Sequence, residues 1–156
     1  MPTITPFLWF DTQAEEAMLL YTSIFKRSKV IAVNRAQGKV VSAQFELEGQ
    51  RFMALNAGPM YTFTEAVSFF VACDTQDEID ELWATLTADG GVPSRCGWLK
   101  DKFGLSWQIV PKTLGSMLGG TDAAASKRAM EAMLTMDKLD LQALQQAYSV
   151  RHDNTT

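Results

Sequence analysis

The sequence contains an internal repeat that constrains its fold more than any other feature. Residues 11–15 and 74–78 share the pattern Asp-Thr-Gln-x-Glu, and a leucine follows each copy at the same offset, at Leu19 and Leu82. Each copy comes directly after a run of large apolar residues and opens a helix-like segment. Two unrelated Asp-capped helices would give the same five matches. Because the order strand, helix, strands recurs around both copies, we predict a duplicated β-α-β-β-β module.

The first module is predicted over residues 1–60. The run at residues 7–10 is typical of a buried strand, and Asp11 and Thr12 then offer a helix N-cap. Apolar residues at spacings of three and four predict a helix that ends near Lys26 and Arg27. Strands are predicted at 30–33, 40–47 and 51–55, with turns at 37–38 and 48–50.

The second module is predicted over residues 66–112. It comprises a strand at 68–73, a helix opened by 74–76 and stopped by 89–91, and a hairpin of 96–99 and 105–110 around a tight turn at 101–104. Residues 113–150 change pattern and predict helices at 122–136 and 141–148 that close the core or cover a sheet edge. We therefore expect one α+β domain over 1–156 with a C-terminal helical extension.

Charge and rare residues exclude several classes of function. The net charge is −4 without a Lys/Arg cluster, so nucleic acid and membranes are not expected partners. The single histidine, His152, is predicted to lie in a solvated tail, which argues against a histidine triad, a multi-histidine zinc site and a zinc deaminase. Cys73 and Cys96 form no C-x-x-C motif. Without a basic leader or a membrane-length apolar run, we expect a cytoplasmic protein with reduced thiols.

The sequence resembles a known family along most of its length. The segments that carry the resemblance are Phe-Leu-Trp-Phe-Asp at 7–11, Glu-Glu-Ala at 15–17, Tyr21, Phe-Glu-Leu at 45–47, residues 49–56, Gly58-Pro59, and above all residues 96–111. They are similar to the PhnB-like branch of the glyoxalase/bleomycin-resistance (vicinal oxygen chelate) superfamily. The helical tail, at 130–134 and 141–148, also fits that branch.

The resemblance implies a fold and an assembly, and it identifies the positions at which a metal would be bound. It implies paired β-α-β-β-β modules whose sheets curl around a pocket, and a homodimer, often with a module or strand exchanged. Metal-dependent members mount His or Glu ligands on four pocket positions, which align here with Pro6, Met53, Ser68 and Gln108. None of these side chains is a good ligand for a divalent metal, so we expect no metal and no cofactor.

The same branch carries the label 3-demethylubiquinone-9 3-methyltransferase-like. A methyltransferase of the common α/β type needs a glycine-rich loop after its first parallel strand. The glycines of this chain lie in predicted hairpin turns, and no G-x-G occurs. The sequence therefore gives the label no physical support.

Aromatic residues on several predicted strands suggest a ligand-binding cleft built from both modules. The predicted lining is Trp9, Phe52, Phe70, Trp98 and Trp107, with Asn56, Ser68 and Gln108 orienting polar atoms of the ligand. Each aromatic residue could equally belong to an ordinary sheet core, and Asn56 could instead form the turn at the end of its strand. No catalytic residue is identified.

Three further side chains have two interpretations each. Cys96 is interpreted as a small buried hydrophobe rather than a reactive thiol, because no suitable cation or helix start lies beside it. Asp101 is a possible acid or base, and its place at the head of a tight turn favours a bond to the backbone of that turn. Glu46 lies on an alternating strand whose polar face could be solvent or cleft.

The most favoured hypothesis is a small-molecule-binding, metal-independent protein with an aromatic-lined cleft. One alternative is a metal-dependent lyase, isomerase or dioxygenase, with a metal held by Glu46, Gln108 and waters. The other is a protein that sequesters a drug or toxin without turnover. Fold alone does not decide among them.

Overall fold

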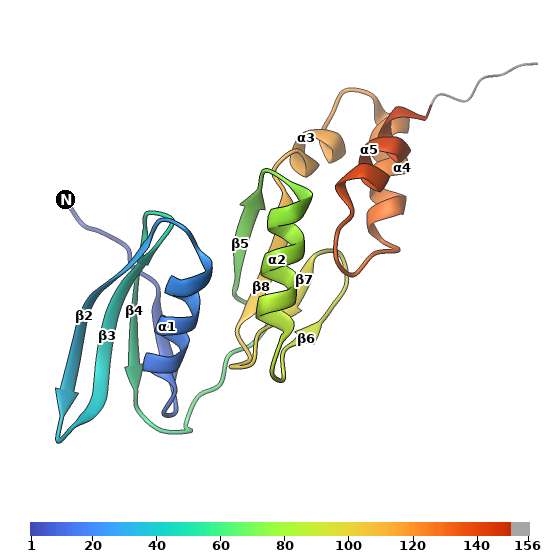
Figure 1. Ribbon diagram of the computed structural model, residues 1–156. Helices are drawn as coiled ribbons and strands as arrows, with labels where there is room; N and C mark the ends of the chain where they lie inside the picture. Colours follow the sequence, from blue (N-terminus) through green and yellow to red (C-terminus); the bar gives the residue numbers. More distant parts are fainter. Residues whose placement is uncertain (151–156) are drawn as a thin grey trace, which may run out of the picture. The chain divides into compact units, whose positions relative to one another are not determined.

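A computed structural model describes residues 1–150 and forms two compact units, one of residues 1–64 and one that begins at residue 65 (Figure 1). His152 lies outside the described residues. The part of the chain that is described contains no helix long and apolar enough to cross a membrane.

The first unit is a four-stranded sheet with one helix. Its elements are β1 (Phe7–Phe10), α1 (Ala14–Ile24), β2 (Ser28–Ala36), β3 (Lys39–Leu47) and β4 (Gln50–Asn56). The strand order is β1-β4-β3-β2, in which β1 is parallel to β4 and the other pairs are antiparallel.

The second unit repeats this plan. Its elements are β5 (Ser68–Cys73), α2 (Gln76–Thr87), β6 (Val92–Pro93), β7 (Trp98–Lys100) and β8 (Ser106–Pro111). The order β5-β8-β7-β6, with β5 parallel to β8, matches the first sheet strand for strand. The predicted duplication of a β-α-β-β-β module is confirmed, and with it the glyoxalase-like α+β fold. The sequence pattern missed only the short strand β6 in these modules.

Three helices follow β8 and form what we call the extension. They are α3 (Leu114–Leu118), α4 (Ala123–Met133) and α5 (Leu141–Ser149), of which α3 was not predicted. They share a buried cluster with the end of β8, made of Val110, Leu114, Met117, Ala129, Leu139 and Leu144. The extension therefore packs on its own module, as an amphipathic helix pair was expected to do.

Backbone hydrogen bonds join the extension to the loop before β7. The N–H groups of Cys96 and Gly97 donate to the carbonyl oxygens of Met136 and Asp137, both at 2.8 Å. Cys96 and Gly97 have φ angles of 59° and 85°, so two successive residues take the left-handed conformation. This conformation turns both N–H groups toward the segment between α4 and α5.

Gln76, at the start of α2, makes a second connection to the extension. Its Nε2 donates to the Leu139 carbonyl at 3.0 Å, and its Oε1 accepts from the Leu141 N–H at 2.8 Å. A single side-chain amide thus bonds the backbone on both sides of Asp140, the N-cap of α5.

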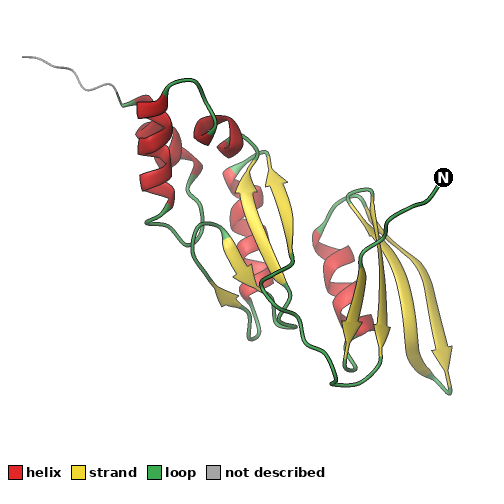
Figure 2. Ribbon diagram, turned by 180° about the vertical axis from the view of Figure 1, so that it is seen from behind, coloured by secondary structure: helices red, strands yellow, loops and turns green. Residues whose placement is uncertain are grey.

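Each sheet has one face covered by its own helix and an opposite face that we call the open face. In the second unit, α2 lies in front of β8 in Figure 1, and the strands lie in front of it in Figure 2. Leu99, Trp107 and Ile109 are at most 2% exposed, whereas their neighbours Trp98 and Gln108 are half-buried. Because side chains alternate along a strand, the first three face α2 and the other two belong to the open face.

The two repeated helices begin differently. Thr75 caps α2, since its side chain accepts a hydrogen bond from the Glu78 N–H at 3.2 Å, within the segment 74–76 that was predicted to open the helix. The predicted cap of α1 by Asp11 or Thr12 is wrong. Gln13 occupies the N-cap without a side-chain bond, and Asn56 of β4 supplies the acceptor for the Ala14 N–H at 2.9 Å.

Candidate functional site

Four of the predicted site residues come together on the open face of the second sheet. The strand register places Phe70 of β5, Gln108 of β8 and Trp98 of β7 opposite one another in one row. Ser68 lies two residues before Phe70 on the same face. Gln108 Nε2 donates to Ser68 Oγ at 2.9 Å, and this bond leaves the amide oxygen of Gln108 available as an acceptor among residues 1–150.

The two aromatic side chains of this row are not buried by their own unit. Phe70 is 61% exposed, although a phenyl ring gains free energy on leaving water, and Trp98 is half-buried. They stand on the two strands that flank β8, with the Gln108 amide between them. The row therefore presents two ring surfaces on either side of a polar group.

A second row on this face was not predicted. Ser106 of β8 lies opposite Ser68 of β5 and Lys100 of β7. Ser106 is 1% exposed, and its hydroxyl has no hydrogen-bond partner among the residues described. Lys100 forms an ion pair with Glu65, just before β5. Parity could have found these residues, because Ser106 and Lys100 lie two positions from Gln108 and Trp98.

Trp9 lies on the open face of the first sheet, opposite Leu55 of β4. Its indole N–H donates to the Gly58 carbonyl at 2.9 Å, and its ring meets that of Tyr61 edge-on at 4.9 Å between centroids. Trp9 therefore offers a ring surface, while its hydrogen-bonding group is already used.

Phe52 and Trp107 belong to the helix-covered sides of their sheets. Phe52 is 5% exposed and stacks on Phe45 at 5.5 Å between ring centroids. Trp107 is 2% exposed, and its indole N–H donates to Asp101 Oδ2 at 2.9 Å. The structure thus places Phe52 in core packing and Trp107 against a buried carboxylate, apart from the row on the open face.

Asn56 is also occupied by its own unit. Its Oδ1 accepts from the Ala14 N–H, and its Nδ2 donates to the Val40 carbonyl at 3.2 Å. The side chain thus ties α1 and β3 to the end of β4. Both polar atoms of its amide are therefore engaged within the first unit.

The positions where the superfamily carries metal ligands do not fit a divalent cation. Of the four aligned positions, Met53 pairs with Phe7, the residue after Pro6, and Gln108 pairs with Phe70, two residues after Ser68. Hydrocarbon, thioether and amide groups are poor ligands for such ions. Within residues 1–150, no three His, Cys, Asp or Glu side chains gather in a group able to hold a metal.

The two cysteines are free and differ in environment. Cys73 is 1% exposed, and burial, aided by the nearby carboxylates of Glu78 and Asp74, raises the pKa of its thiol to about 11. Cys96 is half-buried in the loop that the extension holds. The structure thus keeps Cys73 as a neutral, core-filling thiol.

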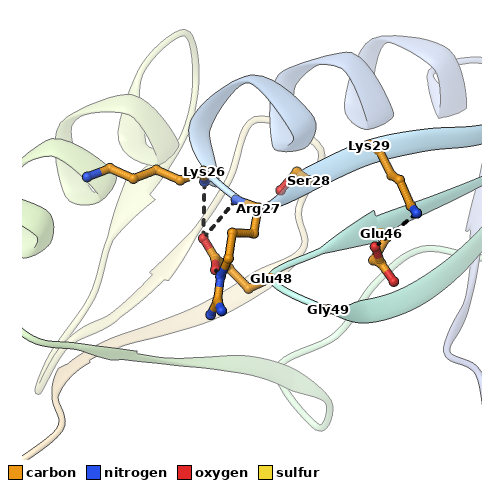
Figure 3. Close-up of a pocket in the computed structure, with 7 residues that line it drawn as sticks. All are labelled: Lys26, Arg27, Ser28, Lys29, Glu46, Glu48 and Gly49. Atoms are coloured by element: carbon orange, nitrogen blue, oxygen red, sulfur yellow. Dashed lines mark hydrogen bonds and ion pairs between the residues drawn. The ribbon is translucent and has the colours of Figure 1, made fainter.

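A pocket of about 330 Å³ lies in the first unit, away from the predicted site residues (Figure 3). Its charged side chains pair with one another: Glu48 Oε2 accepts from Arg27 Nε at 2.8 Å, and Lys29 lies 3.8 Å from Glu46. The Arg27 hydrogen bond holds the pKa of Glu48 below its usual value. This internal pairing leaves no carboxylate of the pocket without a cation, and Glu46 takes part in it.

Comparisons with known proteins agree with the duplicated fold. The profile of the family described as 3-demethylubiquinone-9 3-methyltransferase matches residues 2–110. The PhnB protein from Bacillus cereus is 36% identical, with a TM-score of 0.66, and the match covers 70% of this chain and 99% of that one.

Two more distant structures share the fold. A Pseudomonas aeruginosa protein is 20% identical with a TM-score of 0.58, covering 69% of this chain and 95% of that one. An Arabidopsis thaliana gene product is 18% identical with a TM-score of 0.50, covering 69% and 96%. Among curated proteins, none matches the chain. The family profile and the Bacillus cereus structure together show that the chain belongs to the 3-demethylubiquinone-9 3-methyltransferase (PhnB) family.

Proposed function

We propose that the protein binds a small, planar, partly aromatic molecule on the open face of the second sheet. The observation that carries the proposal is the row in which Phe70 and Trp98 flank the amide of Gln108. Binding sites for small molecules combine apolar and aromatic walls with a few fixed polar groups. Here the hydrogen bond from Gln108 to Ser68 fixes the amide and directs its free oxygen.

The energetics of the row favour a ring-shaped ligand. A flat molecule would remove water from Phe70, which is 61% exposed, and from the half-buried Trp98. Burial of an aromatic surface contributes about 25 cal/mol per Å² before the costs of binding. The Gln108 oxygen would then accept a hydrogen bond from a donor on the ring.

On the open face of the first unit, Trp9 is proposed to offer an aromatic surface of its own. Its indole N–H is already bonded to Gly58, so its contribution would be stacking. Phe52, Asn56 and Trp107 are not part of the proposed site, because their side chains are used inside their own units.

The proposed binding needs no metal and includes no methyl transfer. The amide and hydroxyl groups of the site support the first point, since the site offers neither the carboxylates that hold Mg²⁺ or Mn²⁺ nor the imidazoles that hold Zn²⁺, Ni²⁺ or Fe²⁺. Elemental analysis of gently purified protein tests it: a stoichiometric divalent metal would contradict a metal-free site and favour a lyase, isomerase or dioxygenase. Methyl transfer is suggested by the description of the family alone, which assigns no role to any residue of this site.

Isothermal titration with a panel of neutral and charged aromatic compounds tests the binding proposal. Replacing Trp98 by Leu should weaken any hit by roughly tenfold, as expected for loss of a stacking partner. The matched control is Trp83→Leu on α2, which should leave affinity unchanged. Equal effects of the two substitutions would contradict the site. Mass spectrometry of the bound compound then separates turnover from simple sequestration.

We also propose a cytoplasmic homodimer. The outer edge of β5 supports the assembly, because within the described residues β5 pairs with β8 alone and exposed strand edges favour further pairing. The two free cysteines support a reducing compartment. Light scattering coupled to size exclusion tests the dimer, and a monomer at micromolar concentration would contradict it.

A further inference from the structure

The second row of the open face contains a buried hydroxyl and a paired ammonium side by side. Ser106 Oγ has no partner among the described residues, although its residue is 1% exposed. Lys100 lies directly opposite Ser106 on β7. Side chains at directly opposed positions have Cβ atoms about 5 Å apart, so both groups can reach one small acceptor.

Glu65 occupies the ammonium group of Lys100 in this structure. Glu65 precedes β5, Lys100 belongs to β7, and β8 lies between those strands, so the ion pair bridges the strand that carries Ser106. The hydrogen bond from Lys100 holds the pKa of Glu65 below its usual value. The side chain of Glu65 is 61% exposed and that of Lys100 is 42% exposed, so water and solutes can reach the ion pair. An exposed pair of this kind is weak and exchanges its partner at little cost.

The two rows lie two residues apart along their strands. That spacing corresponds to roughly 6.6 Å, about the reach of an aromatic ring with a short side chain. A ring placed between Phe70 and Trp98 would therefore carry its substituent to Lys100 and Ser106. The substituent that matches an ammonium, a hydroxyl donor and a displaced carboxylate is another carboxylate.

We propose that the site selects arylalkanoates, in which a short side chain joins an aromatic ring to a carboxylate, and that this carboxylate displaces Glu65 from Lys100. Lys100 then pairs with the ligand, and the Ser106 hydroxyl donates to the same carboxylate. This inference rests on the proposed binding at Phe70 and Trp98. It adds that the ligand is negatively charged and that Lys100 and Ser106 bind its carboxylate.

Two probes that differ only in charge test the inference. They are 3-phenylpropionate and the neutral 3-phenylpropanamide, titrated calorimetrically into the full-length chain. The unmodified protein should bind the acid more tightly than the amide. Glu65→Gln should strengthen binding of the acid by up to about fivefold, the value of an exposed ion pair, and leave the amide unchanged.

Lys100→Met should weaken binding of the acid by roughly tenfold or more, because a charge-assisted hydrogen bond is lost. The affinity for the amide should not change. Ser106→Ala should weaken the acid to a smaller extent. The matched control is the ion pair of Lys112 with Asp74, at 2.8 Å. These two residues follow the carboxyl ends of β8 and β5, whereas Glu65 precedes β5. Lys112→Met and Asp74→Asn should change neither affinity. Circular dichroism establishes that each variant is folded.

The outcomes separate the two proposals. If acid and amide bind equally, both depend on Trp98, and Glu65→Gln has no effect, the carboxylate inference is wrong while the binding site stands. If Lys112→Met weakens the acid as much as Lys100→Met does, the effect is one of overall charge and the inference is also wrong. If neither probe binds, the site itself is contradicted, and the inference falls with it.

Discussion

The indole N–H of Trp107 donates a hydrogen bond to Asp101 Oδ2 across 2.9 Å, and both residues are 2% exposed. The other carboxylate oxygen accepts from the N–H groups of Phe103 and Leu105, at 2.9 and 3.0 Å. One buried carboxylate thus fixes the turn between β7 and β8 and orients the largest side chain of the core. The expectation that Asp101 bonds its own turn is confirmed.

Replacing Asp101 by Ala should lower the free energy of unfolding by about 3 kcal/mol, because one change leaves an indole and two backbone N–H groups without their acceptor. Urea denaturation measures the loss. The control is Asp77→Ala, at an exposed position of the first turn of α2, which should cost less than about 1 kcal/mol. Similar losses for the two variants would contradict a central role of Asp101.

Gly97 and Gly104 allow a paired test of close packing. Their φ angles are 85° and 86°, but only at Gly97 would an added Cβ meet other atoms, at 2.8 Å from the Ile109 carbonyl oxygen and 3.0 Å from Leu139 Cδ1. Gly104→Ala should therefore cost about 1 kcal/mol for the backbone conformation alone. Gly97→Ala should cost about 3 kcal/mol or more in thermal or urea unfolding. Equal losses would show that Leu139 and the strand yield freely.

Replacing Asn56 by Ala should destabilise the first unit by about 2 kcal/mol, since the Ala14 N–H and the Val40 carbonyl both lose their partner. Hydrogen exchange at the Ala14 amide should become faster as well. The control is Asn34→Ala, whose exposed amide bonds Ser42 Oγ at 2.9 Å and should contribute below about 0.5 kcal/mol. Unchanged exchange at Ala14 in Asn56→Ala would contradict the capping role.

The two cysteines should differ in alkylation of the native protein. With a pKa of about 11, roughly one Cys73 thiol in a thousand is a thiolate at pH 8, and the side chain is also buried. Iodoacetamide at pH 8 should therefore modify Cys96 first, as peptide mass spectrometry would show. The Cys73 rate should rise about tenfold per pH unit up to its pKa. Equal rates at pH 8 would contradict the buried environment of Cys73.

Local signals in the sequence predicted the elements of the fold well. The strand at residues 7–10 and the strand at 68–73 agree with β1 and β5 at both ends, and α2 begins at Gln76, within the segment predicted to open it. These features depend on neighbouring residues. The cap of α1 was wrong because its acceptor, Asn56, comes from a strand 42 residues away. No local pattern contains that partner.

The orientation of the aromatic residues was harder to predict than their position. Five of the six residues of β8 are buried, on both faces of the strand, so the alternation that normally separates the faces is lost. Trp107 and Gln108 lie on opposite faces by alternation, but such a run does not show which of the two faces the helix. The pairing of Lys100 with Glu65 also depends on strand order, which places β8 between their elements.

The join between the extension and its module bears on how the boundary of the family should be understood. The match to the family profile ends at residue 110. The N–H groups of Cys96 and Gly97, inside the matched segment, nevertheless donate hydrogen bonds to the carbonyl oxygens of Met136 and Asp137, beyond it. Bonds between main-chain groups depend on the path of the chain and are indifferent to the identity of most side chains. In this chain such bonds join the extension to the matched module, so its folded unit continues past the residues that the family profile matches.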